Sequence, residues 1–492
     1  MEIQNRIENR LASFLPRIPL AVWVLALLVG ILIPLKILSL GYIPIDDVKC
    51  HVAKAISGKA WPEILVMDER FAEDEHPGWH SMLGALHRHL NCDADTLIFF
   101  SIAVPFAVFW LIMLCGSRRP EAVLLALMAG SLLSPPSFTR LLNGRPLLVM
   151  MVVYLVLVQI WMRKEKTPPW KIGLSILLIG FSVWVHGSWY LFGFMVAGFA
   201  LANEWRKAWM LGACWLAGVL MGAILTGHPF GYLQETTVHL FNCFSGNLSD
   251  RMLVTELRAQ YTDFFFVIIL LALLWRLARG DWQSLKVWTP LLVLAVLGWV
   301  LGFKVWRFWN DWGFPAAMLW LARELEEVLE SNWESESWKT LGLAVLAAAG
   351  VYFSSTGDIN SRWSSNLTNE CLTSETPGIA GWLPDKDGIV YLSDMPLFFS
   401  MFYKNPNADW RYALGFEPGI MTPENYEIYR KIQWKGSAKF LDLWAAKMRP
   451  EDRMILLQDS PPPLPRLEWH YATDSTWIGR LARTNAVSKA KP

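Results

Sequence analysis

The chain has 492 residues, of which 54% are hydrophobic and only 18% are charged, below the roughly 25% that is usual for a soluble protein. The net charge of +1 excludes a protein built to bind nucleic acid. The apolar residues gather in runs that approach the roughly 20 residues needed to cross a bilayer. Many of the 28 Trp lie near the ends of these runs, where indole rings favour the membrane interface. Composition therefore predicts an integral membrane protein.

The first apolar run covers residues 20–40 and follows a segment, residues 1–19, that carries several arginines. A secretory signal peptide would have a shorter apolar core, followed by a small-residue cleavage site. This run leads instead into a loop with two adjacent carboxylates, Asp46 and Asp47. We therefore interpret it as a retained first membrane span.

The acidic pair begins a predicted helix. Asp46 is a good N-cap, and Gly58 suits the end of a helix of about three turns. On that helix Asp47 and His51 are four residues apart and share a face. Two interpretations stay open. Either the carboxylates only cap the helix and favour its first turn, or one of them acts on a substrate where the membrane meets water.

A second acidic cluster lies in the sequence MDERFAEDEHPGWH, residues 67–80. Pro77 suits the first turn of a helix, which sets two histidines four residues apart beside several carboxylates. Oxygen ligands with an imidazole suit Mg²⁺ or Mn²⁺, so we predict a site for such a divalent cation. A solvated acidic loop is the alternative. The candidate metal ligands are Asp74, Glu75, His76 and His80.

The remaining apolar runs raise the predicted number of spans to about eleven. Lys and Arg concentrate in alternate loops on the side of the N-terminus, which places that side in the cytoplasm. The opposite loops are acidic or rich in histidine and should lie outside, together with the tail from residue 355. The ten further runs are 97–115, 120–134, 146–162, 171–185, 189–203, 209–226, 264–278, 287–303, 311–323 and 339–354.

The tail differs from the rest because its pattern is compatible with water. It contains the β-like runs GIVYLSD, RMILLQ and TWIGRLA and the helix-like stretch MPLFFSMFYKN. This pattern predicts a small α/β domain. We therefore predict a transmembrane domain, residues 1–354, with a structured first outer loop, residues 41–96, and a soluble extracytoplasmic α/β domain, residues 355–492.

Four of the six cysteines fall in predicted outer segments. A compartment that oxidises thiols would permit a Cys50–Cys92 or a Cys243–Cys371 disulfide. Free thiols are the alternative.

Basic side chains also stand at the outer ends of spans, where the charge rule disfavours them. An anionic phosphate is the economical partner for such groups. Snorkelling to the interface is the general alternative, and Asp311 is an alternative partner for Arg307. The candidate substrate-binding residues are His51, Arg140, Arg145, His186, His228, Lys304 and Arg307.

The order of these features resembles the GT-C superfamily of integral membrane glycosyltransferases. The shared features are a first span, a long outer loop that opens with the acidic pair Asp46–Asp47, many further spans and a C-terminal outer α/β domain. The stretch WRFWNDWGFP, residues 306–315, is loosely similar to an Arg-Phe…Pro element before a late span in some of these enzymes. It departs from the longer basic-acidic version of eukaryotic mannosyltransferases. The resemblance covers the architecture of the whole chain and implies a polytopic α-helical membrane fold.

The resemblance also implies a reaction. A sugar would pass from a polyprenyl-phosphate donor, whose tail lies in the bilayer, to a glycan, lipid or protein acceptor at the outer face, with a bacterial inner membrane favoured. Asp46 or Asp47 would act as general base. A divalent cation held by Asp74, Glu75 or His76 would assist a metal-dependent enzyme. The positive groups that would stabilise the leaving phosphate are Arg307 with Arg140, Arg145 or His186.

Other classes of function remain as alternatives. A lipid or polysaccharide transporter or flippase would need polar groups deep within the spans, and the apolar runs carry almost none. A non-catalytic scaffold whose tail binds a partner, and a metal-dependent membrane phosphotransferase or hydrolase, fit the same layout of spans and loops.

Overall fold

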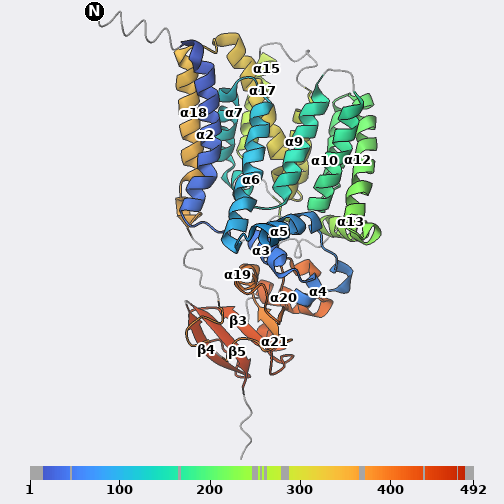
Figure 1. The fold of residues 1–492 in the computed structure, drawn as a ribbon, viewed down its shortest axis with the longest axis vertical. Coiled ribbons are helices and arrows are strands. Elements are labelled where there is room, and N and C mark those ends of the chain that lie inside the picture. Colours follow the sequence, from blue (N-terminus) through green and yellow to red (C-terminus); the bar gives the residue numbers. More distant parts are fainter. Residues whose placement is uncertain are drawn as a thin grey trace, which may run out of the picture.

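An upright bundle of helices stands on a smaller domain that contains a β-sheet, and several short helices lie between the two (Figure 1). The computed structural model describes residues 15–44, 47–163, 168–245, 253–254, 257–259, 263–278, 288–364, 372–379, 381–435, 438–473 and 475–482.

Each of the eleven predicted apolar runs contains a helix of the bundle. Three of these helices are long and apolar enough to cross a membrane: α2 (Ile18–Ser39), α6 (Ala94–Cys115) and α12 (Trp205–Leu225). A fourth crossing is formed if α7 (Pro120–Leu133) and the segment Pro135–Leu142, which bends away by 113°, count as one span. The structure is thus consistent with a membrane protein, although the predicted number of about eleven spans is not confirmed.

Length is the physical reason for most of the difference. The other apolar helices have 10–17 residues, and at 1.5 Å per residue they measure roughly 15–26 Å, less than the roughly 30 Å of a hydrocarbon core. Two further helices, α17 (Phe314–Asn332) and α18 (Trp338–Thr356), are long enough but are not apolar enough. The short apolar helices are α9 (Leu147–Met162), α10 (Pro169–Val185), α11 (Leu191–Leu201), α15 (Phe265–Ala278) and α16 (Pro290–Gly302).

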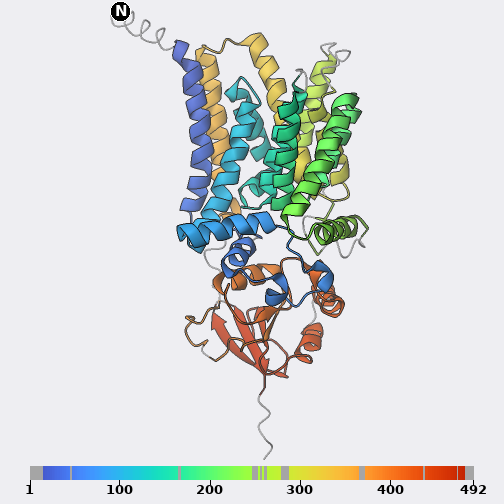
Figure 2. The ribbon, with the colours of Figure 1, turned by 45° about the vertical axis from the view of Figure 1, so that its right-hand side comes forward.

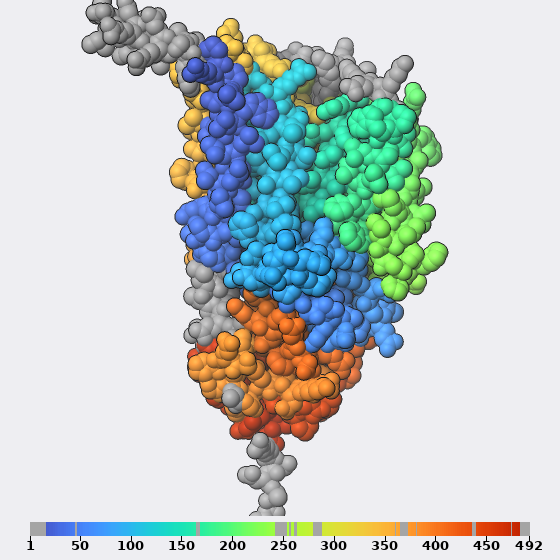
Figure 3. Space-filling view, viewed as in Figure 1, coloured from blue at the N-terminus to red at the C-terminus, as the bar shows by residue number. Residues whose placement is uncertain are grey.

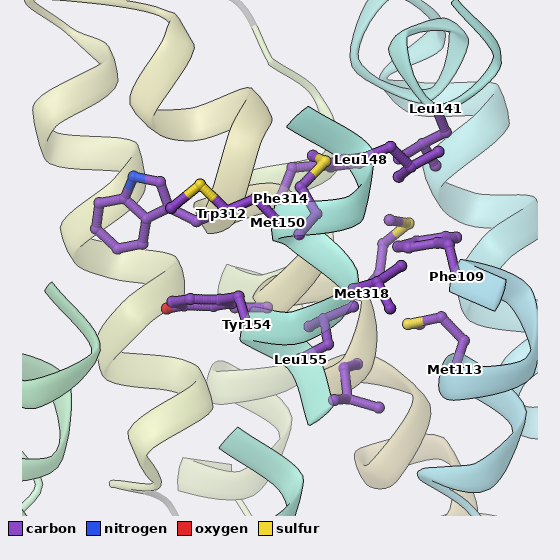
Figure 4. Packing of buried hydrophobic residues seen from close by; sticks show 14 of the residues in the cluster. Phe109, Met113, Leu141, Leu148, Met150, Tyr154, Leu155, Trp312, Phe314 and Met318 are labelled. Atoms are coloured by element: carbon purple, nitrogen blue, oxygen red, sulfur yellow. The ribbon is translucent and has the colours of Figure 1, made fainter. Parts of the chain in front are cut away.

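Large apolar side chains fill the space between the bundle helices. Figure 4 shows Phe109 of α6, Tyr154 of α9 and Met318 of α17 in one cluster, and all three are buried. Where backbones approach most closely, glycines replace these side chains. A Cβ atom on Gly298 of α16 would lie 2.5 Å from the Cα of Gly313, so these two elements can pack only without side chains there.

Short helices of the first loop lie between the bundle and the sheet domain. They are α3 (Asp47–Ser57), α4 (Trp61–Ile64) and α5 (Pro77–Leu90), and α5 lies across the end of the bundle (Figure 2). The predicted end of α3 at Gly58 is confirmed, because this glycine adopts a φ of +62° directly after the helix. The predicted start of a helix at Pro77 is confirmed as well. A further helix at this level is α13 (Pro229–Ser245).

The predicted small α/β domain at the C-terminus is confirmed. Its five strands have the order β2-β1-β3-β5-β4; β1 is parallel to β2 and β3, while β5 is antiparallel to β3 and β4. The strands are β1 (Ile389–Leu392), β2 (Arg411–Tyr412), β3 (Arg453–Leu457), β4 (Leu467–Thr473) and β5 (Thr476–Leu481). The helices are α19 (Met395–Lys404), α20 (Pro423–Lys435) and α21 (Ala438–Ala445).

The helix α3 belongs to two hydrophobic cores at once. Val48 and Val52 pack in the core of the bundle, whereas Cys50 and Ala53 pack in the core of the sheet domain. The chain after α3 continues this contact, because Leu65 forms a parallel bridge with Tyr412 at the edge of the sheet. Figure 3 shows these blue first-loop segments between the bundle and the orange sheet domain. The first loop therefore joins the two parts of the molecule.

Of the two alternatives that the sequence left open for Cys50 and Cys92, a disulfide or free thiols, the structure has free thiols. Cys50 is a buried free thiol and Cys92 is also free, so the Cys50–Cys92 disulfide is not formed. The reason is that α3 turns Cys50 into the core of the sheet domain. The other predicted pair involves the side chain of Cys243 and Cys371, which lie outside the described residues.

Candidate functional site

A cavity of about 470 Å³ lies where the bundle, the first loop and the sheet domain meet. Its wall brings together residues that are far apart in the sequence, from Asp47 on α3 to Glu417 in the sheet domain. The ionisable groups on the wall are the carboxylates Asp47, Glu75 and Glu417, the guanidiniums Arg140, Arg145 and Arg307, the imidazoles His51, His76, His186 and His239, the thiol Cys50 and the phenol Tyr190.

Two carboxylates hold the three guanidiniums in place. Asp311, only 2% exposed, accepts hydrogen bonds from Nη2 of Arg140 and Nε of Arg307, both at 3.0 Å. The Asp47 Oδ2 atom lies 3.5 Å from Nε of Arg145. These contacts fix the positions of planar groups whose geometry suits a carboxylate or a phosphate.

The position of Asp311 follows from an irregular helix. Trp309–Gly313 forms a π-helical turn, a feature that often occurs at functional sites. The turn also buries Asn310, whose Oδ1 accepts a hydrogen bond from Ser137 at 2.6 Å. The Asp263 carboxylate accepts further hydrogen bonds here from Ser134, at 2.6 Å, and from the indole of Trp309. A buried polar network thus anchors the segment that carries Arg307 and Asp311.

A chain of hydrogen bonds approaches the cavity from the first loop. Nδ1 of His80 lies 2.6 Å from Oδ2 of Asp74, and Nε2 of His80 lies 2.8 Å from Nδ1 of His51. His51 and His80 are both 7% exposed. Burial and the neighbouring His80 lower the pKa of His51 well below its ordinary value. Although burial opposes it, the contact with His80 lowers the pKa of Asp74 overall, so this group is a carboxylate.

Two further histidines pack against this chain. The rings of His76 and His186 meet edge to face with centroids 4.7 Å apart, and His76 lies 4.9 Å from the ring of His51. Burial lowers the pKa of His76, so its ring is neutral at neutral pH. The neutral rings of His51, His76 and His186 add an uncharged polar surface to the cavity wall.

The rest of the wall is apolar and comes from both halves of the molecule. Leu147 begins α9 of the bundle, and Trp306 precedes the π-helical turn. Phe399 belongs to α19 of the sheet domain, and Phe416 lies in a loop of that domain. Because polar and apolar groups share the wall, the cavity suits a ligand that has a charged head and an apolar portion.

The structure gathers most of the predicted site residues on this wall. His228 and Lys304 are exposed and do not line the cavity. Asp74 and His80 lie behind His51 rather than on the wall. Asp46 lies outside the described residues. The predicted residues on the wall are Asp47, His51, Glu75, His76, Arg140, Arg145, His186 and Arg307.

The predicted metal site is not assembled. Among the residues that the structure describes, no group of three or more His, Cys, Asp or Glu side chains is arranged to hold a metal ion. Asp74 and His80 form a hydrogen bond with each other, and the ring of His76 packs against the ring of His186. We therefore do not assign the residues from Asp74 to His80 as metal ligands.

The sequence prediction misses His239 and one of the contacts of Asp311. His239 of α13 lies between Glu75, at 3.9 Å, and Glu417, at 3.8 Å. Asp311 was considered as a partner of Arg307 alone, whereas it holds Arg140 as well. The sequence spacing carries no signal for these contacts, because they join segments that are brought together only by the fold.

The fold and the cavity together define a class: a helical protein with apolar helices able to cross a membrane, a small α/β domain, and a half-polar cavity lined by arginines between the two. No protein-family model matches the chain, and no curated protein matches it either, so the comparisons assign it to no family.

Proposed function

We propose that the protein is a membrane glycosyltransferase that moves a sugar from a polyprenyl-phosphate donor to an acceptor. The observation that carries this proposal is one cavity, next to the apolar bundle, whose wall holds Arg140, Arg145 and Arg307 together with the carboxylate of Asp47. Such a wall offers binding groups for an anionic head and a carboxylate for the chemistry of transfer.

The guanidiniums support the donor part of the proposal. A phosphate accepts several charge-assisted hydrogen bonds from arginine, and Asp311 already orients two of the three groups. Orientation before binding reduces the entropy lost when the ligand arrives. A polyprenyl tail would then lie along apolar surface that continues from the cavity wall, for example at Leu147 and Trp306.

The same groups suit the transfer step. An acceptor oxygen would attack the anomeric carbon while the bond from that carbon to the phosphate oxygen breaks. Negative charge then grows on the leaving phosphate, and preorganised cations such as Arg307 stabilise that charge in the transition state. The sequence predicts Asp46 or Asp47 for the attacking side, and of these two Asp47 lies on the cavity wall.

The sheet domain supports the acceptor part of the proposal. Met395 and Phe399 of α19, together with Phe416 and Glu417, close one part of the cavity wall. An acceptor that reaches the cavity would therefore contact this domain as well as the bundle. A phosphotransferase or hydrolase would use the same anion site but would leave no sugar on an acceptor, so the two are separated by their products.

The test uses the purified full-length protein in lipid nanodiscs. Short-chain polyprenyl phosphate should bind, and polyprenyl-phosphate mannose or arabinose should release polyprenyl phosphate and label an acceptor in a membrane extract. Release together with a labelled acceptor supports the proposal. Release of phosphate or sugar without any labelled acceptor supports a hydrolase. Failure of every donor to bind contradicts an anion site of this kind.

A further inference from the structure

The hydrogen-bonded chain of Asp74, His80 and His51 has a direction that follows from which atoms can donate. The Asp74 carboxylate can only accept, so Nδ1 of His80 carries a hydrogen and donates it across 2.6 Å. A neutral imidazole then has an acceptor at its other nitrogen. In that neutral form of His80, its Nε2 accepts a hydrogen bond from Nδ1 of His51 across 2.8 Å.

This arrangement leaves one atom available. With a hydrogen on Nδ1, the neutral ring of His51 has its lone pair on Nε2. The structure gives that nitrogen no hydrogen bond among the residues it describes, and His51 lines the cavity. An imidazole with a lone pair beside an anion-binding wall can act as a general base.

We propose that His51 takes the proton from the attacking acceptor hydroxyl, and that His80 and Asp74 are positioning residues that hold it in the required tautomer. This role rests on the proposed glycosyltransferase function. It assigns to His51 the step that the sequence predicted for Asp46 or Asp47.

The step balances in atoms and charge. The acceptor oxygen bonds to the anomeric carbon, and the electron pair of the broken carbon–oxygen bond leaves on the polyprenyl phosphate. The hydroxyl proton goes to Nε2 of His51, and the hydrogen on Nδ1 of His51 moves to Nε2 of His80. The positive charge then lies on His80, which is in contact with the Asp74 carboxylate. The chain is reset when Nε2 of His51 loses one proton to water and the hydrogen on Nε2 of His80 returns to Nδ1 of His51.

The surroundings explain why the charge moves on to His80. Burial, His80 and Arg145 all disfavour a cation on His51 and keep its ring neutral at neutral pH. His80 has the Asp74 carboxylate at 2.6 Å, and this negative charge offsets the positive charge that the transferred proton brings. Asp47, one turn before His51 on the same face, then offsets positive charge that develops on the sugar ring in the transition state.

The test is a double-mutant cycle on the full-length protein with a polyprenyl-phosphate sugar as donor. His51→Gln should lower kcat by about 10²–10⁴ with little change in KM for the donor. Asp74→Asn keeps the shape but donates to His80, which reverses both tautomers and leaves a hydrogen on Nε2 of His51. It should lower kcat by at least about tenfold, and it should add nothing in the His51→Gln background. His89→Gln, an exposed histidine on the same helix as His80, is the control and should behave as wild type.

Three results would overturn this role. The first is a kcat of His51→Gln or of Asp74→Asn that equals the kcat of the wild type, in an assay in which the wild type turns over the donor. The second is a cycle in which the two losses multiply, because independent effects mean that Asp74 does not act through His51. The third is a metal requirement: a chelator abolishes the activity of the wild type and Mn²⁺ restores it, whereas Mn²⁺ has no effect on the activity of His80→Gln. That result would make His80 and its neighbours metal ligands. If the wild type turns over no donor at all, the proposed function fails first and this role falls with it.

Discussion

Asp311 uses both of its oxygens, one for Arg140 and one for Arg307. A carboxylate that is only 2% exposed would be costly without such partners, and each guanidinium gains a fixed orientation in return. The sequence suggested two partners for Arg307, either Asp311 or a phosphate. Because the contact with Asp311 orients Arg307 and does not exclude a phosphate, the two interpretations are compatible.

Replacement of Arg307 tests the anion site. We expect Arg307→Ala to weaken binding of polyprenyl phosphate by about 1.5–3 kcal/mol, or roughly 10- to 150-fold, because one charge-assisted contact is lost. Lys304→Ala is the matched control, since it removes a positive charge from the same loop at an exposed position away from the cavity. Titration in nanodiscs measures both. Equal affinities for Arg307→Ala and wild type would reduce this residue to a structural partner of Asp311.

We predict different roles for the two carboxylates of the acidic pair. We expect Asp47→Asn to lower kcat by about 10²-fold, because a preorganised negative charge on the cavity wall is removed. Asp46→Asn should have a smaller effect, because Asn caps a helix about as well as Asp. Steady-state kinetics of the two folded variants makes the comparison. A greater loss in Asp46→Asn would move the catalytic carboxylate to that position.

The pH profile reports on His51. Its pKa is lowered, so the ring is neutral at neutral pH and becomes charged only as the pH falls through a value well below 6.5. Since a general base must be neutral, we expect kcat to be level near neutrality and to fall only in that acidic range, and the fall should vanish in His51→Gln. A midpoint at or above 6.5 would contradict this assignment. The groups that surround His51 are Asp47, Cys50, Asp74, His76, His80, Arg145 and His186.

At the scale of elements, the π-helical turn depends on a glycine contact with α16. We expect Gly298→Ala to lower the thermal unfolding temperature by several degrees, because overpacking costs about 1–3 kcal/mol, and to weaken donor binding because the turn carries Asp311. Gly342→Ala in α18 is the control, since a Cβ atom there meets nothing within 4 Å. Similar melting temperatures for the two variants would show that the close contact is unimportant.

Local signals in the sequence predicted the elements well, and the contacts between elements poorly. The end of α3 at Gly58 and the start of α5 at Pro77 follow from backbone preferences that need no tertiary information. The approach of His51 to His80 joins two helices, and spacing along the chain does not reveal it. The sequence predicted His80 and Asp74 as metal ligands, because composition alone does not distinguish a coordination shell from a hydrogen-bonded chain.

The whole molecule presents the site at one end of the bundle, next to the sheet domain, and the loop between α17 and α18 lies at the other end (Figure 1). We predict that the sheet domain is external and the N-terminus cytoplasmic. In a cysteine-free background, Lys431→Cys should react with an impermeant thiol reagent on intact cells, whereas Ser335→Cys should react only after lysis. Both positions are exposed. The opposite labelling pattern would invert the topology.

The place of α3 in two cores makes the site sensitive to the angle between the two halves. Val52 is fixed to the bundle and Ala53 to the sheet domain, so any tilt of one half against the other must move this single helix. Asp47 and His51 move with it, away from arginines that belong to the bundle alone. A compound that binds between the bundle and the sheet domain and separates them by an ångström or two would therefore inhibit without entering the cavity. Its inhibition would be non-competitive with substrate.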